Sequence, residues 1–562
     1  MGGQDDSRQQ LSSALALVES GAAEPELTLE QLDELRQVGS ERTVAAGEVL
    51  FHPGDVYNFL AIVEGRIAVI DDFRGRREQV VAERGPGGFI GEVGLLSHQL
   101  FPFTAVARDA SRVIEVQTDA LRRIIDEEPA LSDIILRAFL VRRAKLIGQG
   151  LGLRVVGSRF SADTRRLLDF LTRNGLPFGW LDVERDPEAE GVLCDFNIAA
   201  HETPVVIAGT IVLRNPSNEA LAETLGFVPN TQSTDVFDLL VVGAGPAGLA
   251  ASVYGASEGL NTLAIDNIAV GGQAGTSSRI ENYLGFPAGV SGRELAVRAQ
   301  LQAEKFNARI TVPCDAVALE QVDGMHRVRL SSGDHILARS VIIATGAQYA
   351  RLPLERLAEL EGVGVYYAAT VAEARMCAGD SVALVGGGNS AGQAAVFLAR
   401  RCKRVYVLVR RSGLSETMSR YLIHQIESHD NIEVLLQTEV RQLLGDGGIT
   451  GLQIESTVDG SRRTLDVCAL FVFIGAEPHT DWLAGEIALD EHGFVLTGRD
   501  LPADADGAVR LPLETSRAGV FAAGDVRSGS IKRVASAVGE GAMAVRFVYD
   551  YLNPRHPVTP QG

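Results

Sequence analysis

Cysteine is scarce in this sequence of 562 residues, and no two cysteines lie close together. The five are Cys194, Cys314, Cys377, Cys402 and Cys468. The chain therefore has no CxxC motif and no zinc-knuckle spacing. Cysteines scattered in this way, in a reducing compartment, usually pack as small apolar side chains. We accordingly expect all five to be buried structural residues.

Long apolar runs and excess positive charge are also missing. No apolar run of about 18 residues occurs, which argues against a membrane-spanning helix. The polar start MGGQDDSRQQ is unlike a secretory signal. The formal net charge is −20, and a strongly acidic chain is a poor partner for nucleic acid or an anionic membrane. We expect a cytoplasmic protein that binds neither and that is built from several domains.

Residues 25–150 predict a β-rich domain that follows a flexible tail over 1–24. TLEQLDELRQV indicates an amphipathic helix capped by Thr28, short strands follow, and two helical stretches close the segment. This order resembles the cyclic-nucleotide-binding domain, and the motifs that carry the resemblance are HisProGlyAsp (52–55), GluGly (64–65) and PheIleGlyGluValGlyLeuLeu (89–96). The resemblance implies a β-barrel or jelly-roll-like fold in which Glu92 holds a ribose hydroxyl.

The same segment lacks the arginine that pairs with the cyclic phosphate in that family. No Arg occurs between Arg84 and Arg108, and a buried phosphate diester without a cationic partner is costly. Amide groups at a helix N-terminus could supply part of that charge. Three alternatives stay open: a cyclic nucleotide, another ligand, or a structural or docking module that has lost its ligand.

Residues 151–228 predict the element order β-α-β-α-β-β-α, which resembles the thioredoxin/glutaredoxin fold. ThrPro at 203–204 matches that family's cis-proline position. The family's nucleophilic cysteine lies at the N-terminus of the first helix, where the helix dipole lowers the thiol pKa. This chain has SerArgPheSer at 158–161, and hydroxyl groups cannot carry out thiol–disulfide exchange. We expect a packing or recognition module, joined to the remainder by a linker at 229–234.

The stretch DVFDLLVVGAGPAGLAASVYGASEGLNTLAID predicts a strand, a GxGxxG turn, a helix and a second strand. Gly243 permits the tight turn, Gly245 lets a pyrophosphate approach the backbone, and Gly248 lets helix and strand pack closely. Asp266 follows Gly248 by 18 residues, close to the spacing of a ribose-binding acid. With the helix N-terminus facing the phosphates, the pattern predicts a dinucleotide site.

A second copy, SVALVGGGNSAGQAAVFLARRCKRVYVLVRR, carries the pattern GxGxxA with Gly386 and Gly388. Its second strand ends in Arg410 and Arg411 instead of an acid. An acid would repel a 2′-phosphate, whereas arginines attract it, so the pattern favours NADPH over NADH. Two dinucleotide sites, one nested in the other, predict a flavin and a pyridine nucleotide.

Further motifs agree with this interpretation: SVIIATGA (340–347), GVFAAGD (519–525), GlyGlyGln (271–273) and FIGAEP (473–478). Together they resemble the low-molecular-weight thioredoxin reductase family over residues 235 to about 550. The resemblance implies two nested three-layer Rossmann-like domains in a homodimer. The FAD-binding domain is split over 235–350 and 485–562, and the NADPH-binding domain occupies 351–484.

The resemblance also implies which residues contact the cofactors. For FAD they are Gly243, Gly245, Pro246, Ala247, Gly248, Asp266, Gly272, Gln273, Asn282, Ala344, Thr345, Gly346, Gly524, Asp525, Val534 and Ala535. For NADPH they are Gly386, Gly388, Asn389, Ser390, Arg410, Arg411 and Gly475.

The chain departs from the family where it keeps its reactive dithiol. The family pattern is Tyr-Cys-Ala-Thr-Cys, and here Tyr367 is followed by Ala368, Ala369, Thr370 and Val371, so Ala368 and Val371 replace the thiols. Cys377 lies nearby but has no partner at CxxC spacing.

We therefore predict an FAD-dependent NADPH oxidoreductase that passes electrons from reduced flavin to an unknown, non-thiol acceptor. Two alternatives stay open. One is a regulatory flavoprotein that senses NADPH or redox state without turnover. The other is a disulfide reductase that relies on the thiols of a partner.

Overall fold

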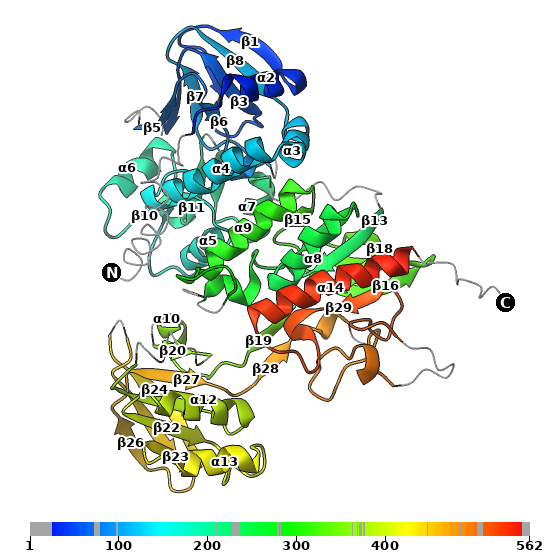
Figure 1. The fold of residues 1–562 in the computed structure, drawn as a ribbon. Coiled ribbons are helices and arrows are strands. Elements are labelled where there is room, and N and C mark those ends of the chain that lie inside the picture. Colours follow the sequence, from blue (N-terminus) through cyan, green and yellow to red (C-terminus); the bar gives the residue numbers. More distant parts are fainter. Residues whose placement is uncertain are drawn as a thin grey trace, which may run out of the picture. The chain divides into compact units, whose positions relative to one another are not determined.

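A computed structural model describes most of the chain (Figure 1). The described residues are 25–71, 79–96, 99–209, 211–226, 236–277, 280, 283–361, 364–367, 369, 374, 377–446, 448–483, 485–502 and 510–553. The predicted tail at 1–24 and linker at 229–234 lie outside them. The chain forms two compact units; the first is Met1–Thr276, Gly292–Gly346 and Thr480–Gly562, and the second is Ser277–Ser291 and Ala347–His479.

The first unit begins with a β-rich domain, as the sequence predicts. Helix α2 (Leu29–Val38) starts at Thr28, whose hydroxyl accepts from the amide of Gln31 in a capping box. Two antiparallel four-stranded sheets follow, in the orders β1-β8-β3-β6 and β2-β7-β4-β5. The strands are β1 (Ser40–Val44), β2 (Val49–Phe51), β3 (Phe59–Glu64), β4 (Ile67–Asp71), β5 (Gln79–Arg84), β6 (Phe89–Ile90), β7 (Thr104–Ala107) and β8 (Ser111–Val116). Helices α3 (Thr118–Glu127) and α4 (Pro129–Gln149) close the domain.

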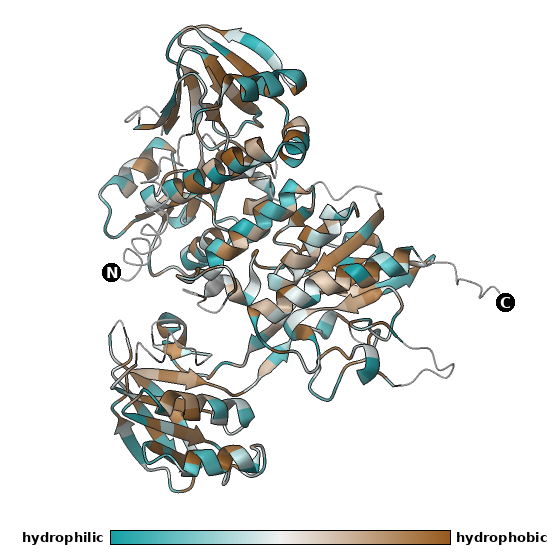
Figure 2. Ribbon diagram, viewed as in Figure 1, coloured by the Kyte–Doolittle hydropathy of each residue, from teal (hydrophilic) through white to brown (hydrophobic). Residues whose placement is uncertain are grey.

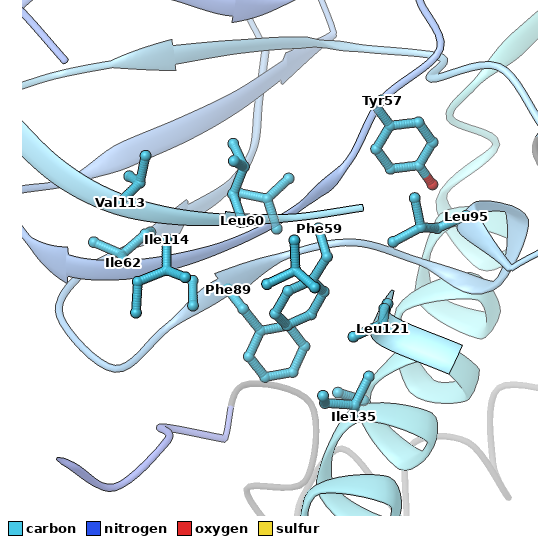
Figure 3. Close-up of a cluster of buried hydrophobic side chains, with 14 of the residues drawn as sticks. Tyr57, Phe59, Leu60, Ile62, Phe89, Leu95, Val113, Ile114, Leu121 and Ile135 are labelled. Atoms are coloured by element: carbon cyan, nitrogen blue, oxygen red, sulfur yellow. The ribbon is translucent and has the colours of Figure 1, made fainter. Parts of the chain in front are cut away.

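The core of this domain lies between its sheets and the two closing helices. Figure 3 shows Phe59 and Phe89 side by side, with Leu121 of α3 and Ile135 of α4 next to them. The two rings lie 5.2 Å apart between centroids, and both are fully buried. Burial of side chains of this size, at roughly 25 cal/mol per Å², supplies the main driving force that holds helices against sheet.

The next domain has the predicted thioredoxin-like order. Its elements are β9 (Leu153–Gly157), α5 (Ala162–Arg173), β10 (Phe178–Asp182), α6 (Glu188–Asp195), β11 (Val205–Ala208), β12 (Ile211–Arg214) and α7 (Asn218–Thr224). The strands form one sheet in the order β10-β9-β11-β12. The Thr203–Pro204 peptide is cis, as predicted, and Val312–Pro313 is a second cis bond that the sequence did not indicate.

The remainder of the first unit is built on a seven-stranded sheet. Its order is β15-β14-β13-β18-β17-β16, with β29 paired to β18. The strands are β13 (Val236–Val242), β14 (Thr262–Ile265), β15 (Arg309–Thr311), β16 (Ala316–Val322), β17 (Met325–Leu330), β18 (His335–Ile343) and β29 (Val520–Ala522). Helices α8 (Pro246–Ser257), α9 (Gly292–Lys305) and α14 (Val534–Leu552) accompany it. Figure 2 shows hydrophobic residues concentrated on the strands, which apolar helices must then cover.

The second unit contains a five-stranded parallel sheet in the order β20-β27-β21-β22-β23. Its elements are β20 (Val365–Tyr366), β21 (Ser381–Val385), α12 (Asn389–Ala399), β22 (Arg404–Val409), α13 (Arg420–Glu427), β23 (Ile432–Leu436) and β27 (Ala469–Val472). A separate antiparallel sheet contains β24 (Thr438–Leu444), β25 (Gly451–Ser456) and β26 (Arg462–Leu465). No helix among the described residues is long and apolar enough to cross a membrane.

Candidate functional site

The first glycine-rich loop connects β13 to α8, at the carboxyl end of the central strand of its sheet. Gly243 has φ +109, and a Cβ there would lie 2.2 Å from the carbonyl oxygen of Ala344. A Cβ on Gly248 would lie 1.8 Å from the carbonyl oxygen of Gly243. A Cβ on Gly245 would instead meet nothing closer than 3.9 Å. Gly243 and Gly248 thus permit the turn and its packing, whereas Gly245 leaves space beside the start of α8.

This space is bordered by backbone groups that suit a pyrophosphate. Gly245 is the N-cap of α8 and Pro246 is its first residue, so the unpaired amides of the first turn point out of the helix end. The partial positive charge of a helix N-terminus stabilises phosphate groups. The loop therefore fits the diphosphate of a dinucleotide such as FAD.

Other predicted FAD residues converge on the same helix end. A Cβ on Gly272 would lie 3.0 Å from the Cα of Gly245, which brings the GlyGlyGln motif against the loop. Gln273 follows in the same short 3-10 turn and is exposed. The AlaThrGly motif, Ala344–Gly346, directly follows β18, and Ala344 is the residue that contacts the turn at Gly243.

The C-terminal motif reaches this place from the other side. A Cβ on Gly524 would lie 3.0 Å from the Cβ of Ala247, and a Cβ on Gly541 would lie 2.1 Å from the carbonyl oxygen of Ala247. Helix α14 therefore crosses α8 in close contact. The first turn of α14, with Val534 and Ala535, is partly exposed.

Asp525 combines burial with an unused carboxylate. Desolvation raises the pKa of Asp525 above its ordinary value, although the nearby ammonium group of Lys532 offsets part of this rise. Among the described residues no hydrogen bond engages this carboxylate. A half-buried carboxylate without a donor is costly, so a hydroxyl-bearing ligand would satisfy it. This fits the predicted contact with the ribityl or pyrophosphate part of FAD.

Asp266 has a structural role that its spacing did not indicate. Its Oδ2 accepts the amide of Ala244 at 2.8 Å, and its Oδ1 accepts the amides of Ile268 and Ala269 at 2.9 and 3.0 Å. Burial raises its pKa, and these three hydrogen bonds oppose that shift. Asp266 thereby fastens the end of β14 to the glycine-rich loop, and ribose binding by its remaining acceptor capacity stays a prediction.

The second glycine-rich loop, between β21 and α12, follows the same design. Gly386 has φ +148, and a Cβ there would lie 2.4 Å from the carbonyl oxygen of Phe473. A Cβ on Gly388, the N-cap of α12, would meet only the carbonyl oxygen of Thr417 at 4.0 Å. The open side of the loop therefore again lies at a helix N-terminus, where phosphate groups bind.

The remaining predicted NADPH residues surround this loop in the second unit. Asn389 accepts the amide of Ser419 at 2.8 Å, so its side chain braces the loop, while Ser390 is exposed. Gly475 follows β27 with φ +110. Arg411 pairs with Glu416 at 3.2 Å, whereas Arg410 is exposed and has no ion pair among the described residues. Arg410 is therefore the better placed of the two arginines for a 2′-phosphate.

Three predicted positions lie outside the described residues. They are Asn282, assigned to FAD, and Ala368 and Val371, which replace the family's cysteines.

The predicted ligand residue of the N-terminal domain is engaged within the protein. Glu92 Oε1 accepts the amide of Gly94 at 3.1 Å, and Oε2 lies 3.7 Å from Nε of the buried Arg143. Beside it, Tyr57, which precedes β3, packs against Phe101 with ring centroids 4.7 Å apart. Phe101 lies in the segment before β7 where the family has its arginine. This apolar packing favours the structural or docking alternative over phosphate binding.

Helix α9 of the flavin half joins the same region of the first unit. Leu301 belongs to the hydrophobic core of the N-terminal domain, and Glu304 is only 4% exposed. Glu304 Oε1 accepts from Gln300 at 2.8 Å, whereas Oε2 has no partner among the described residues. Desolvation raises the pKa of Glu304 to about 7, although Arg143 and Arg122 lower it.

The expectation that every cysteine is buried is wrong for Cys194, which is exposed on α6. It holds for Cys377 and Cys402. These two share one hydrophobic cluster with the half-buried Cys468, a grouping that sequence spacing could not reveal.

Comparisons with known proteins agree with the two loops and the N-terminal fold. A family model described as pyridine nucleotide-disulphide oxidoreductase matches residues 237–541, and one described as cyclic nucleotide-binding domain matches residues 41–128. The chain is 33% identical over 314 residues to a thioredoxin reductase of Mycolicibacterium smegmatis, which covers 56% of this chain and 95% of that protein.

Two further relatives cover the same part of the chain. A 34.2 kDa protein in the rubredoxin operon of Clostridium pasteurianum is 30% identical over 323 residues, which is 56% of this chain and 97% of that protein. The crystal structure of thioredoxin reductase from Streptococcus pyogenes MGAS5005 aligns with a TM-score of 0.51 at 30% identity, over 57% of this chain and 100% of that one.

Proposed function

The chain belongs to the pyridine nucleotide-disulphide oxidoreductase family, and we propose that it takes electrons from NADPH and delivers them to an acceptor other than a thiol pair of its own. It is an oxidoreductase of the thioredoxin reductase type, with FAD and NADPH as its cofactors. Bound FAD supplies the two-electron chemistry that links NADPH to the acceptor. The protein binds both cofactors.

One observation carries this proposal: the dinucleotide loops are complete, yet the sequence contains no CxxC. The family's dithiol positions are occupied by Ala368 and Val371. Ser161 caps the first helix of the thioredoxin-like domain, in the stretch where that fold has its cysteine. Neither alanine, valine nor serine can exchange disulfides. The chain therefore keeps both glycine-rich loops but has lost the thiols that would take electrons from the flavin.

Groups in the first unit bind FAD, and groups in the second unit bind NADPH. In the first unit, the amides at the start of α8 hold the diphosphate of FAD, and Asp525 accepts hydrogen bonds from its hydroxyl groups. In the second unit, the amides at the start of α12 hold the diphosphate of NADPH, and Arg410 pairs with its 2′-phosphate. The chain is proposed to act as a homodimer, by analogy with the family.

Anaerobic stopped-flow mixing with NADPH tests the proposal. We expect the visible absorbance band of the oxidised flavin to bleach, and to recover on addition of a quinone, free flavin, an iron–sulfur or rubredoxin-type protein, or O₂. A Gly388→Ala variant is the control, because its added Cβ enters the open side of the NADPH loop and leaves the FAD loop unchanged. This variant should bind FAD normally but bleach more slowly with NADPH. Absence of bleaching in the parent protein would refute the proposal. Recovery with disulfide substrates alone would show instead that partner thiols reach the flavin.

A second candidate function is a regulatory flavoprotein that the N-terminal domain monitors. The observation that favours it is the packing of α9, whose Leu301 and Glu304 lie in and beside the core of that domain. The same helix contacts the turn that holds Gly272 and Gln273. Bleaching by NADPH without recovery by any acceptor would favour this candidate.

A further inference from the structure

Three cysteines from distant parts of the sequence lie at one edge of the sheet in the second unit. Cys377 precedes β21, Cys402 precedes β22 and Cys468 immediately precedes β27. These strands are parallel neighbours, with β21 in the middle, so the three residues lie at their amino ends. The glycine-rich loop follows the carboxyl end of β21. The cysteines therefore lie at the opposite edge of the sheet from the NADPH loop.

Backbone hydrogen bonds hold this arrangement together. The amide of Cys468 donates to the carbonyl of Ser381 at 2.9 Å, and the amide of Asp380 donates to the carbonyl of Cys377 at 3.1 Å. The amide of Lys403 donates to the carbonyl of Asp380 at 2.8 Å. One short turn, Cys377 to Ser381, is thus bonded to both neighbouring segments.

The three thiols differ in exposure and in their readiness to ionise. Cys377 and Cys402 are buried, at 3% and 5% exposed, whereas Cys468 is half-buried. Cys468 packs against the cluster that contains Cys377, and the interaction between the two thiols lowers the pKa of Cys468 and raises that of Cys377. Burial raises the pKa of Cys402 to about 11. Because the thiolate is the nucleophile, Cys468 is the reactive member and Cys377 is the thiol beside it.

We propose that Cys468 and Cys377 form a reversible disulfide when a hydroperoxide oxidises Cys468. The Cys468 thiolate attacks the outer peroxide oxygen, the O–O bond breaks, and the leaving alkoxide or hydroxide takes a proton to become an alcohol or water. This gives a sulfenic acid at Cys468. The Cys377 sulfur then attacks the Cys468 sulfur, and the hydroxyl group leaves with the Cys377 proton as water. Two thiols and one alkyl hydroperoxide thereby yield a disulfide, an alcohol and one water, and hydrogen peroxide yields a disulfide and two waters.

The cluster is a redox site and not a metal site. Over the part of the chain that the structure describes, no group of three or more His, Cys, Asp or Glu side chains is arranged to hold a metal ion. The disulfide would join Cys377, which comes six residues after Val371 in the sequence, to Cys468 at the start of β27. It would thus add a covalent link across an existing backbone contact, independently of whether the flavin turns over.

Differential alkylation of the purified, FAD-containing protein tests this inference. The reduced protein is treated with hydrogen peroxide or an alkyl hydroperoxide, free thiols are blocked, and disulfides are then reduced and labelled with a second reagent. Peptide mapping should show that Cys377 and Cys468 move together into the oxidised pool and form one linked peptide. Cys314 is a matched control, because it is also only partly exposed but burial raises its pKa to about 12.

Variants separate the roles of the two residues. Cys468→Ser should leave Cys377 reduced under peroxide. Cys377→Ala should oxidise more slowly, because the thiol that lowers the pKa of Cys468 is lost, and Cys468 should then remain as a sulfenic acid that a cyclic dione traps. Cys402→Ser, in the same cluster, should still form the disulfide. The inference is overturned if Cys314 oxidises as fast as Cys468, if Cys377 pairs with Cys402 instead, or if Cys377 oxidises in the Cys468→Ser protein. NADPH-dependent flavin bleaching should persist in Cys468→Ser, because neither glycine-rich loop contains this residue. Absence of bleaching in the parent protein would count against the proposed function and would leave the disulfide untouched.

Discussion

Replacing Glu304 by Gln should stabilise the folded protein at alkaline pH and leave its stability at acidic pH almost unchanged. Glu304 is 4% exposed, and its Oε2 has no hydrogen-bond partner among the described residues. Its pKa rises from 4.5 to about 7 on folding. The folded chain therefore holds a proton here that the unfolded chain releases between these two values.

The sign and size of the effect follow from that shift. A carboxyl group whose folded pKa is raised destabilises the folded state as pH rises, because ionisation is more favourable in the unfolded chain. The penalty is absent well below pH 4.5, grows up to about pH 7 and is constant above it. A shift from 4.5 to about 7, at about 1.4 kcal/mol per pKa unit, amounts to about 3 kcal/mol. Gln keeps the shape and the hydrogen bonding without the charge.

Thermal unfolding of the parent and of Glu304→Gln at about pH 5 and about pH 8.5 measures the effect. For a cooperative unit of several hundred residues we expect a Tm increase of roughly 3–6 °C at the higher pH and little change at the lower one. His326 provides a control of opposite sign, because burial lowers its pKa from 6.5 to about 4. His326→Leu should therefore protect the protein only as pH falls below about 6.5. An equal Tm change at both pH values for Glu304→Gln would refute the reasoning.

Three further predictions concern the cofactor loops. Gly245→Ala should fold normally but lose FAD affinity by about tenfold or more, because its Cβ enters the space left for the pyrophosphate; flavin absorbance per protein and far-UV circular dichroism measure the two effects. Arg410→Ser should raise the KM for NADPH about tenfold and leave that for NADH unchanged, since only the 2′-phosphate contact is lost. Asp525→Asn should weaken FAD binding about tenfold through loss of a charge-assisted hydrogen bond, measured by the FAD concentration that restores holoenzyme; unchanged affinity would exclude a contact.

Local patterns in the sequence predicted much of the fold. The cap at Thr28, the glycine spacing around Gly243 and Gly386, and the cis bond at Pro204 all depend on neighbouring residues, and the structure confirms each. The parallel strand pairs around β13 and β21 could be expected for the same reason, because strand–turn–helix patterns repeat along the chain.

Contacts between distant residues could not be predicted in this way. The approach of Cys377 to Cys468 depends on the pairing of β21 with β27, and these cysteines are separated by 91 positions. The burial of Glu304 depends on packing between α9 and the N-terminal domain, which no periodicity encodes. For Asp266, spacing identified the residue, but its hydrogen bonds to the loop amides depend on the conformation of that loop.

Thiols in a flavoprotein of this kind can have two different functions. They can pass electrons from the reduced flavin during turnover, or they can form a disulfide in response to an oxidant. A dithiol that passes electrons in turnover must come close to the reduced cofactor, and the family carries it in the stretch where this chain has Ala368 and Val371. Cys377 and Cys468 lie instead at the amino edge of their sheet, whereas the NADPH loop lies at its carboxyl edge. The pair is therefore separated from the NADPH loop by the length of the strands. A pair in that position can record oxidation without carrying turnover electrons, and this agrees with the proposed function, in which the flavin reduces the acceptor directly.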